Sequence, residues 1–89
     1  MNCYNTYFEV AGRIAAIYDA REIAPNALIR EMLIECEPDR SDVSNSVTVT
    51  LFGERCGLAD RYKAGDYVRV SGEICATYHE VQKIRRVSA

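Results

Sequence analysis

The chain has 89 residues, 48% of them hydrophobic and 27% charged, and a formal net charge of −2. This length limits it to one domain, residues 1–89, with a small core, and the composition excludes a disordered protein. No apolar run approaches the roughly 18 residues of a membrane span and the N-terminus lacks a secretory pattern, so we expect a cytoplasmic protein without membrane contact. The slightly negative charge gives no overall electrostatic indication of nucleic-acid binding.

The first element is predicted to be a long strand that begins near Tyr7. Apolar residues alternate with others along it and place Phe8, Val10, Gly12, Ile14, Ala16 and Tyr18 on one face. Gly12 indicates a bend or bulge where the strand curls. A helix over residues 11–23 is the alternative, because this segment also contains good helix formers, but the early β-branched and aromatic residues favour a strand.

A second strand is predicted over residues 28–37. Its alternation turns three apolar residues inward, namely Met32, Ile34 and Cys36. Leu33 would then lie outward as an exposed apolar residue suited to an interface. The flanking segments 19–27 and 38–45 are predicted to be loops, the first from its Pro-Asn turn signal and the second from its polar composition.

The stretch from Val47 to Ile74 is predicted to form a strand, a short helix, a turn and another strand. In the first of these strands, the residues expected to face outward are Ser46, Thr48, Thr50 and Phe52. Residues 54–62 can form about two helical turns, and Gly65 supplies a positive φ to the turn that follows. Val68 then restarts the period-two alternation.

The last strand is predicted over residues 81–87, after a tight connection at 76–80. Its apolar residues are three apart, so we expect a bulge or a short helical ending. The complete order is β-β-β-α-β-β. It predicts an all-β, five-stranded OB-fold Greek-key barrel with a short helix between strands 3 and 4.

Two segments carry a family resemblance. VTVTLFGERCGLADRYKAGDYVRVSGEI resembles the core of bacterial single-stranded-DNA-binding proteins, and FEVAGRI resembles their first strand. The loop lengths are more similar to those of primosomal protein N and of small uncharacterised OB-fold proteins. The likeness spans most of residues 8–75 and implies non-catalytic binding of single-stranded DNA, with Phe52 at the position of a base-stacking phenylalanine.

The chain also departs from that family. It contains no tryptophan, and the positions of the stacking tryptophans correspond to Ser46 and roughly to Arg40. The long hairpin that grips DNA in the family is reduced to a few residues around Tyr78. The acidic partner-recruiting tail has no counterpart before Ala89.

Binding of a single strand without sequence preference needs aromatic faces for the bases and cations for the phosphates. OB-folds place both on the outer face of strands 2 and 3 and in the loops that join strands 1–2 and 4–5. On this basis the candidate nucleic-acid-binding residues are Arg13, Arg30, Thr48, Thr50, Phe52, Arg69, Tyr78, Lys83, Arg85 and Arg86.

Each candidate also has a purely structural interpretation. Phe52 would cap the barrel against the helix, and Tyr78 would be an ordinary turn aromatic. The arginines at 13 and 69 would pair across the sheet with Glu9 or Glu73. The group at positions 83, 85 and 86 would be a solvated strand edge.

Catalysis and metal binding are not expected. The cysteines, at positions 3, 36, 56 and 75, form no CxxC pair, and His79 is the single histidine, so the sequence predicts neither a metal site nor a cofactor. Without a signal peptide, reduced thiols are favoured over two disulfides. His79-Glu80 is a lone titratable pair, and no phosphate-binding glycine loop or hydrolase motif is present.

Two hypotheses follow. The first is a homodimeric or homotetrameric protein that binds single-stranded DNA, or RNA, with little sequence specificity, alongside replication, repair or recombination proteins. The second is an OB module for protein assembly that lacks nucleic-acid binding, which the missing tryptophans, the short loop and the acidic composition favour. Convergence of the arginines at 13, 30 and 69 on Phe52 would strengthen the first hypothesis. Glu31, Glu35 and Asp42 beside Phe52 would weaken it.

Overall fold

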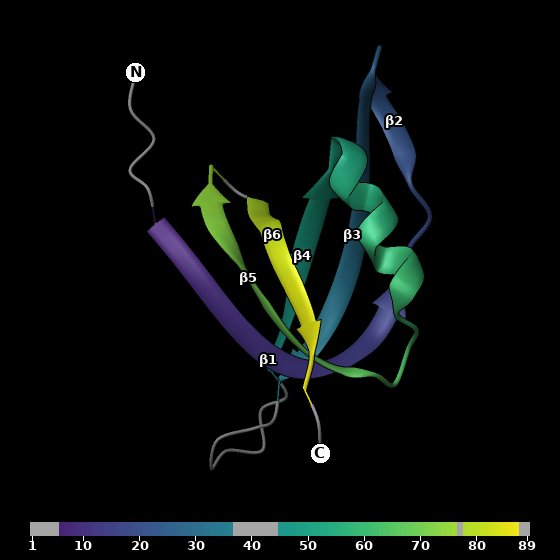
Figure 1. Ribbon diagram of the computed structural model, residues 1–89. Helices are drawn as coiled ribbons and strands as arrows, with labels where there is room; N and C mark the ends of the chain where they lie inside the picture. The colour runs from purple at the N-terminus through teal and green to yellow at the C-terminus, as the bar shows by residue number, and fades with distance from the viewer. Residues whose placement is uncertain (1–5, 37–44, 77, 88–89) are drawn as a thin grey trace.

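The computed structural model describes residues 6–36, 45–76 and 78–87, and these form strands with one short helix (Figure 1). The elements are β1 (Thr6–Ile17), β2 (Arg21–Ala24), β3 (Ala27–Cys36), β4 (Asn45–Phe52), the 3₁₀ helix η1 (Gly53–Arg61), β5 (Tyr67–Cys75) and β6 (Tyr78–Arg86). The predicted all-β class is confirmed. The helix follows β4 because the short strand β2 adds one strand before it. Of the predicted connection 38–45, residues 38–44 lie outside the described residues, and Asp42 is among them. Asn45 is the first residue of β4.

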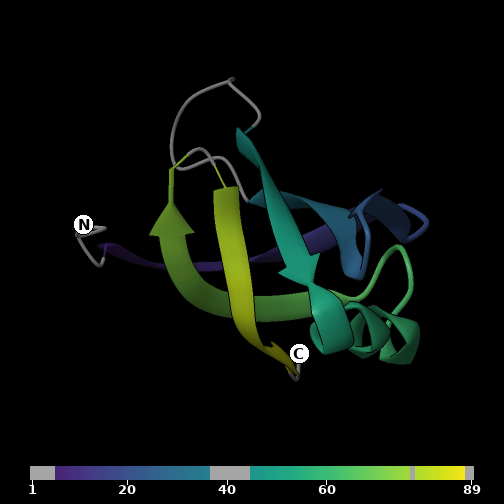
Figure 2. The ribbon, with the colours of Figure 1, turned by 90° about the horizontal axis from the view of Figure 1, so that it is seen from above.

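The strands form one sheet that curls into a barrel. Its order is β1-β5-β6-β4-β3-β2, with an additional pairing of β1 to β3 that closes it. The long first strand makes this closure possible, because Arg13 pairs with Tyr67 of β5 and also with Glu35 of β3. Figure 1 shows β1 bending beneath the other strands, and Figure 2 shows β5 curving round the barrel with η1 at one end. This is the OB-fold that the order of elements predicted.

Gly12 lies where β1 bends. A Cβ atom there would meet the Glu35 carbonyl oxygen at 2.5 Å, so a side chain would obstruct the approach of β1 to β3. The pairing with β3 then shifts between Ile14 and Ala16, as a bulge does. The segment is therefore a curled strand, as the sequence favoured, and the alternative of a helix over residues 11–23 is wrong.

The bulge changes which residues of β1 face the core. Ile17 packs against the core cluster, whereas Tyr18, predicted on the inward face, is exposed. Leu33, which the sequence predicted to be exposed, is half-buried on β3.

The predicted loop at 19–27 contains a strand. Its backbone pairs with β3 through Arg21↔Ile29 and Glu22↔Leu28, while the predicted turn forms at residues 25–26. Asn26 takes a φ of 63°, a left-handed conformation that asparagine tolerates. The short strand exists because a hairpin partner is available, which local composition does not reveal.

The final hairpin is tighter than predicted. β6 begins at Tyr78, so the connection predicted over 76–80 is too long. The predicted irregularity is a bulge, since the pairing of β5 with β6 shifts between Ser71 and Gly72. A Cβ atom on Gly72 would overlap the Glu80 carbonyl oxygen, so the close passage of the two strands depends on glycine.

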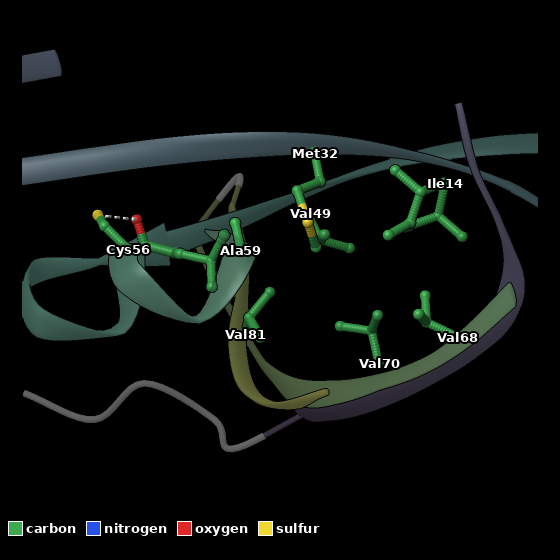
Figure 3. Close-up of a cluster of buried hydrophobic side chains, with 10 residues drawn as sticks. Ile14, Met32, Val49, Cys56, Ala59, Val68, Val70 and Val81 are labelled. Carbon is green, nitrogen blue, oxygen red and sulfur yellow. Dashed lines mark hydrogen bonds between the residues drawn. The ribbon is translucent and has the colours of Figure 1, made fainter. Parts of the chain in front are cut away.

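The core lies inside the barrel between β1, β3, β4, β5, β6 and η1 (Figure 3). Its buried residues are Ile14, Met32, Ile34, Val49, Leu51, Cys56, Ala59, Val68, Val70 and Val81. Within this cluster, the Cys56 thiol donates to the Leu51 carbonyl at 3.4 Å, and burial raises the pKa of that thiol. The buried residues Met32, Ile34, Val49, Leu51, Val68 and Val70 follow the alternation predicted for β3, β4 and β5. No described helix is long and apolar enough to span a membrane.

Candidate nucleic-acid interface

Phe52 and Tyr78 meet where β4 lies beside β6. Within the described residues, the two strands run parallel and pair through Thr50↔Glu80, and Figure 2 shows them side by side. The rings of Phe52 and Tyr78 lie 5.6 Å apart at an interplanar angle of 85°, an edge-to-face contact. Tyr78 is 42% exposed and Phe52 is partly exposed. The fold thus brings together two aromatics that separate arguments had selected.

The surface beside these rings is formed by β3 and β4. Thr48 is exposed and lies opposite Leu33. Thr50 was predicted to be exposed as well, but it is only 2% exposed. Its side chain is short, and its cross-strand neighbours are the longer Glu31 and Glu80, so they shield it. We call the surface made by Thr48, Phe52 and Tyr78 the aromatic face.

Acidic side chains share the aromatic face. Glu31 pairs with Thr50 and Glu35 pairs with Ser46 along the β3–β4 ladder, so both carboxylates project on the same side as these β4 residues. This is the arrangement that the sequence identified as unfavourable to nucleic-acid binding, because carboxylates repel phosphates.

Two arginines missed by the sequence analysis lie next to Glu31 and Glu80, the two acids that flank Thr50. Arg21 Nη2 is 3.7 Å from Glu31 Oε1, and Arg55 Nη1 is 3.9 Å from Glu80 Oε2. Both guanidinium groups are about half exposed or more, so these ion pairs are weak and the cations can exchange partners. No local signal could have identified them, since only the pairing of β2 with β3 and of β4 with β6 brings them there.

Arg30 is not on the aromatic face. Its Nε donates to the Tyr18 carbonyl at 2.8 Å, and its Nη1 donates to Asp60 Oδ1 at 2.8 Å and to the Cys56 carbonyl at 3.3 Å. Its cross-strand partner is the buried Leu51, so Arg30 belongs to the inward row of β3 at the end of the barrel. The side chain therefore ties the end of β1 and the helix η1 to β3.

Three other predicted cations gather on the outer face of β5 and β6, on the side of β6 that is away from β4. Arg69 and Arg85 are direct cross-strand partners, and Lys83 pairs with Ser71. We call Arg69, Lys83 and Arg85 the basic cluster. They line a depression of about 570 Å³. The predicted pairing of Arg69 with Glu9 is present, with Arg69 Nη1 3.4 Å from Glu9 Oε1.

The remaining two cations lie neither beside Phe52 nor in the lining of the depression. Arg13 is exposed on β1 between Glu35 and Tyr67, and Glu35 pairs with Ser46 at the opposite end of β4 from Phe52. Arg86 donates to Asp66 Oδ2 and to the Arg61 carbonyl, both at 3.2 Å, and its guanidinium lies 5.2 Å from the Tyr62 ring centroid.

The arginines at 13, 30 and 69 therefore do not converge on Phe52, the arrangement that would have strengthened the nucleic-acid hypothesis. Within residues 6–36, 45–76 and 78–87, no three His, Cys, Asp or Glu side chains gather as metal ligands would.

Comparison with known proteins supports the fold. No family model and no curated protein matches the chain. Among solved structures, a mitochondrial single-stranded DNA binding protein from S. cerevisiae matches with a TM-score of 0.80 and 20% identity over 96% of this chain and 97% of that one. The protein PriB from Ralstonia solanacearum gives 0.77 and 12% over 96% and 100%, and an SSB domain from Synechococcus sp. gives 0.72 and 19% over 97% and 98%. The chain thus has the OB-fold of single-stranded-DNA-binding and PriB proteins, as its sequence resemblance indicated.

Proposed function

We propose that the protein is a non-catalytic OB-fold protein that binds single-stranded DNA with little sequence specificity. One observation supports this most directly: the partly exposed Phe52 and the exposed Tyr78 form an aromatic pair on the outer strand face of a fold shared with single-stranded DNA binding proteins. Every base has a π-face, so stacking on these rings does not depend on sequence.

The charges around the aromatic face set the expected strength of binding. Glu31 and Glu80 oppose an incoming phosphate, whereas Arg21 and Arg55 attract it. Because both ion pairs are solvent-exposed, exchanging a carboxylate partner for a phosphate costs little. We therefore expect moderate affinity that falls as salt rises.

The proposal includes assembly and cellular context. One small domain presents a short binding surface, so a homodimer or homotetramer would lengthen it, and half-buried Leu33 is an apolar residue for such a contact. The protein would act in the cytoplasm with DNA replication, repair or recombination proteins. Sedimentation equilibrium of the wild type and of Leu33→Glu tests the assembly, since a charge there should produce monomers.

The first experiment measures fluorescence anisotropy of a labelled oligo-dT titrated with the wild type, Phe52→Ala and Tyr78→Ala. One stacking contact is worth about 1–3 kcal/mol, so each alanine should weaken binding by about 5-fold to 150-fold. Tyr7→Ala is the matched control, because this exposed ring lies on β1, which is separated from β6 and Tyr78 by β5. If neither Phe52→Ala nor Tyr78→Ala weakens binding, these rings are not part of the site.

A second function is favoured by the acidic residues Glu31 and Glu35 on the aromatic face. They suit an OB module that binds protein and not nucleic acid. Absence of oligo-dT binding at tens of micromolar protein and low salt would replace the first function with this one.

A further inference from the structure

The basic cluster has three features that a surface without a ligand does not explain. The first is that Arg69 and Arg85 stand directly opposite one another across β5 and β6. Like charges in this position destabilise a sheet. The second is the charge of the depression itself, whose lining contains Arg69, Lys83 and Arg85 but a single carboxylate, Glu9. This local excess of positive charge occurs in a chain with a net charge of −2.

The third feature is an unsatisfied donor. Arg69 Nε is buried and makes no hydrogen bond, although the tip of the same guanidinium reaches Glu9 at 3.4 Å. A buried N–H group without an acceptor costs free energy and calls for an explanation. An anion in the depression would relieve the repulsion between the two arginines, and an oxygen of that anion could accept from this donor.

β6 connects this depression to the aromatic face. Tyr78 is the first residue of β6 and Lys83 lies five residues further, about 17 Å along the strand. The bulge opposite Gly72 keeps the outward row continuous, because Glu80 pairs with Glu73 and Lys83 pairs with Ser71 on the same side of the sheet. A ligand that follows the outer surface of β6 therefore passes from the aromatic ring to the cations.

We propose that the basic cluster is a phosphate-binding site and that single-stranded DNA held on the aromatic face continues along β6 into it. The proposal rests on the proposed function and extends the binding site to the opposite side of β6.

The acids along this path already have partners. Glu80 faces Arg55, and Glu73 Oε1 accepts from Gln82 Nε2 at 2.8 Å. Two of the cluster's cations are exposed, and the 570 Å³ depression has the size of a site for a small ligand such as one nucleotide.

The test compares two oligonucleotides. A labelled oligo-dT of about 3 nucleotides is too short to span the roughly 17 Å from Tyr78 to Lys83, whereas one of about 25 nucleotides also reaches the basic cluster. Both are titrated over a salt series with the wild type and with Lys83→Gln/Arg85→Gln. The control is Arg61→Gln/Lys63→Gln, which removes the same charges from exposed positions outside the depression.

We expect the slope of log K against log salt for the long oligonucleotide to fall by about 1.4 in the Lys83→Gln/Arg85→Gln variant, because each single-strand phosphate contact contributes about 0.7. The short oligonucleotide and the control variant should keep the wild-type slope. An unchanged slope for the long oligonucleotide, with binding intact, overturns the β6 path but leaves the proposed function standing. Failure of the wild type to bind either oligonucleotide overturns both.

A separate arm tests whether a free phosphate compound is the occupant. Amide resonances of Ser71, Lys83 and Arg85 are followed by NMR during titration with inorganic phosphate and with thymidine 5′-monophosphate. Saturable shifts with these compounds, together with an unchanged slope for the long oligonucleotide, would assign the site to a free phosphate and overturn the nucleic-acid path. Loss of slope in the variant, with weak and unsaturated shifts, supports it.

Discussion

The aromatic face and the basic cluster occupy opposite sides of β6 and contain different chemistry. On the aromatic face the two arginines, at positions 21 and 55, are each opposed by a glutamate. The depression at the basic cluster is lined by three cations and one carboxylate, Glu9, which pairs with Arg69. Single-strand binding needs both stacking and charge. Under the proposed function, these two requirements would be met on separate surfaces, with β6 connecting them.

The largest expected effect comes from the point where β5 and β6 pass most closely. Gly72→Ala places a Cβ atom onto the Glu80 carbonyl oxygen. Relief requires the two strands to move apart, which would separate the aromatic face from the basic cluster, so we expect a loss of about 3 kcal/mol or more of unfolding free energy. Urea denaturation followed by circular dichroism measures it.

Gly57→Ala is the matched control for that substitution. No atom lies within 4 Å of a Cβ built at Gly57, and its φ is not positive. Its stability should stay within about 0.5 kcal/mol of the wild type. Equal effects of the two substitutions would show that the close passage at Gly72 is not a constraint.

Arg30→Ala should separate structural cations from binding cations. The substitution removes hydrogen bonds to the Tyr18 carbonyl, the Cys56 carbonyl and Asp60 from a side chain that is 18% exposed. We expect a loss of about 2 kcal/mol of stability, since hydrogen bonds of charged groups contribute about 1.5–3 kcal/mol each and part of this is regained by hydration.

The same variant should bind oligo-dT with an unchanged salt slope under conditions where it is folded. Lys83→Gln/Arg85→Gln should give the reverse result, with stability kept and the slope reduced. A reduced slope for Arg30→Ala would return this residue to the binding site.

The buried face of the barrel was predictable from sequence, because alternation along a strand is a local property of the chain. Period-two alternation fixes which side chains of a strand point inward, so Met32 and Ile34 were correctly placed in the core. The same alternation placed Phe52 on the outer face. The clustering of Val81 and Ile84 three residues apart also indicated the bulge in the final hairpin correctly.

The remaining features depend on partners that are distant in sequence. Arg30 contacts residues 12, 26 and 30 positions away, so its sequence neighbours gave no sign of its structural role. Thr50 is shielded by Glu80, and only the parallel pairing of β4 with β6 brings these two residues together. Strand β2 exists only as the hairpin partner of β3.

Glu31→Gln should sharpen the contrast between the two surfaces by making the aromatic face more like the basic cluster. The substitution removes a carboxylate from this face and releases Arg21, 3.7 Å away. Exposed ion pairs are worth about 0.2–1 kcal/mol, so affinity for a short oligo-dT should rise by about 1.4-fold to 5-fold. Asp19→Asn removes the same charge from an exposed loop position and serves as the control. Equal gains from both variants would indicate a general effect of net charge.

The smallest effect concerns how Arg86 is kept apart from the basic cluster. Asp66 Oδ2 accepts from the Lys63 backbone N–H at 3.0 Å and from Arg86 at 3.2 Å. The Lys63 hydrogen bond is the main cause that holds the pKa of Asp66 below its usual value, with Arg86 adding to it. A carboxyl whose pKa is lower in the folded state stabilises the protein above its unfolded pKa of about 3.9, and this stability is lost as pH falls through the folded pKa.

The melting temperature of the wild type should therefore fall on acidification below about pH 4. Asp66→Asn should have a slightly lower melting temperature at pH 7 and a shallower fall in acid, because the amide cannot be protonated in this range. The substitution also releases Arg86 towards solvent, so the salt slope for the long oligonucleotide should stay the same or rise slightly. A melting profile of Asp66→Asn that parallels the wild type down to about pH 2.5 would remove Asp66 from this role.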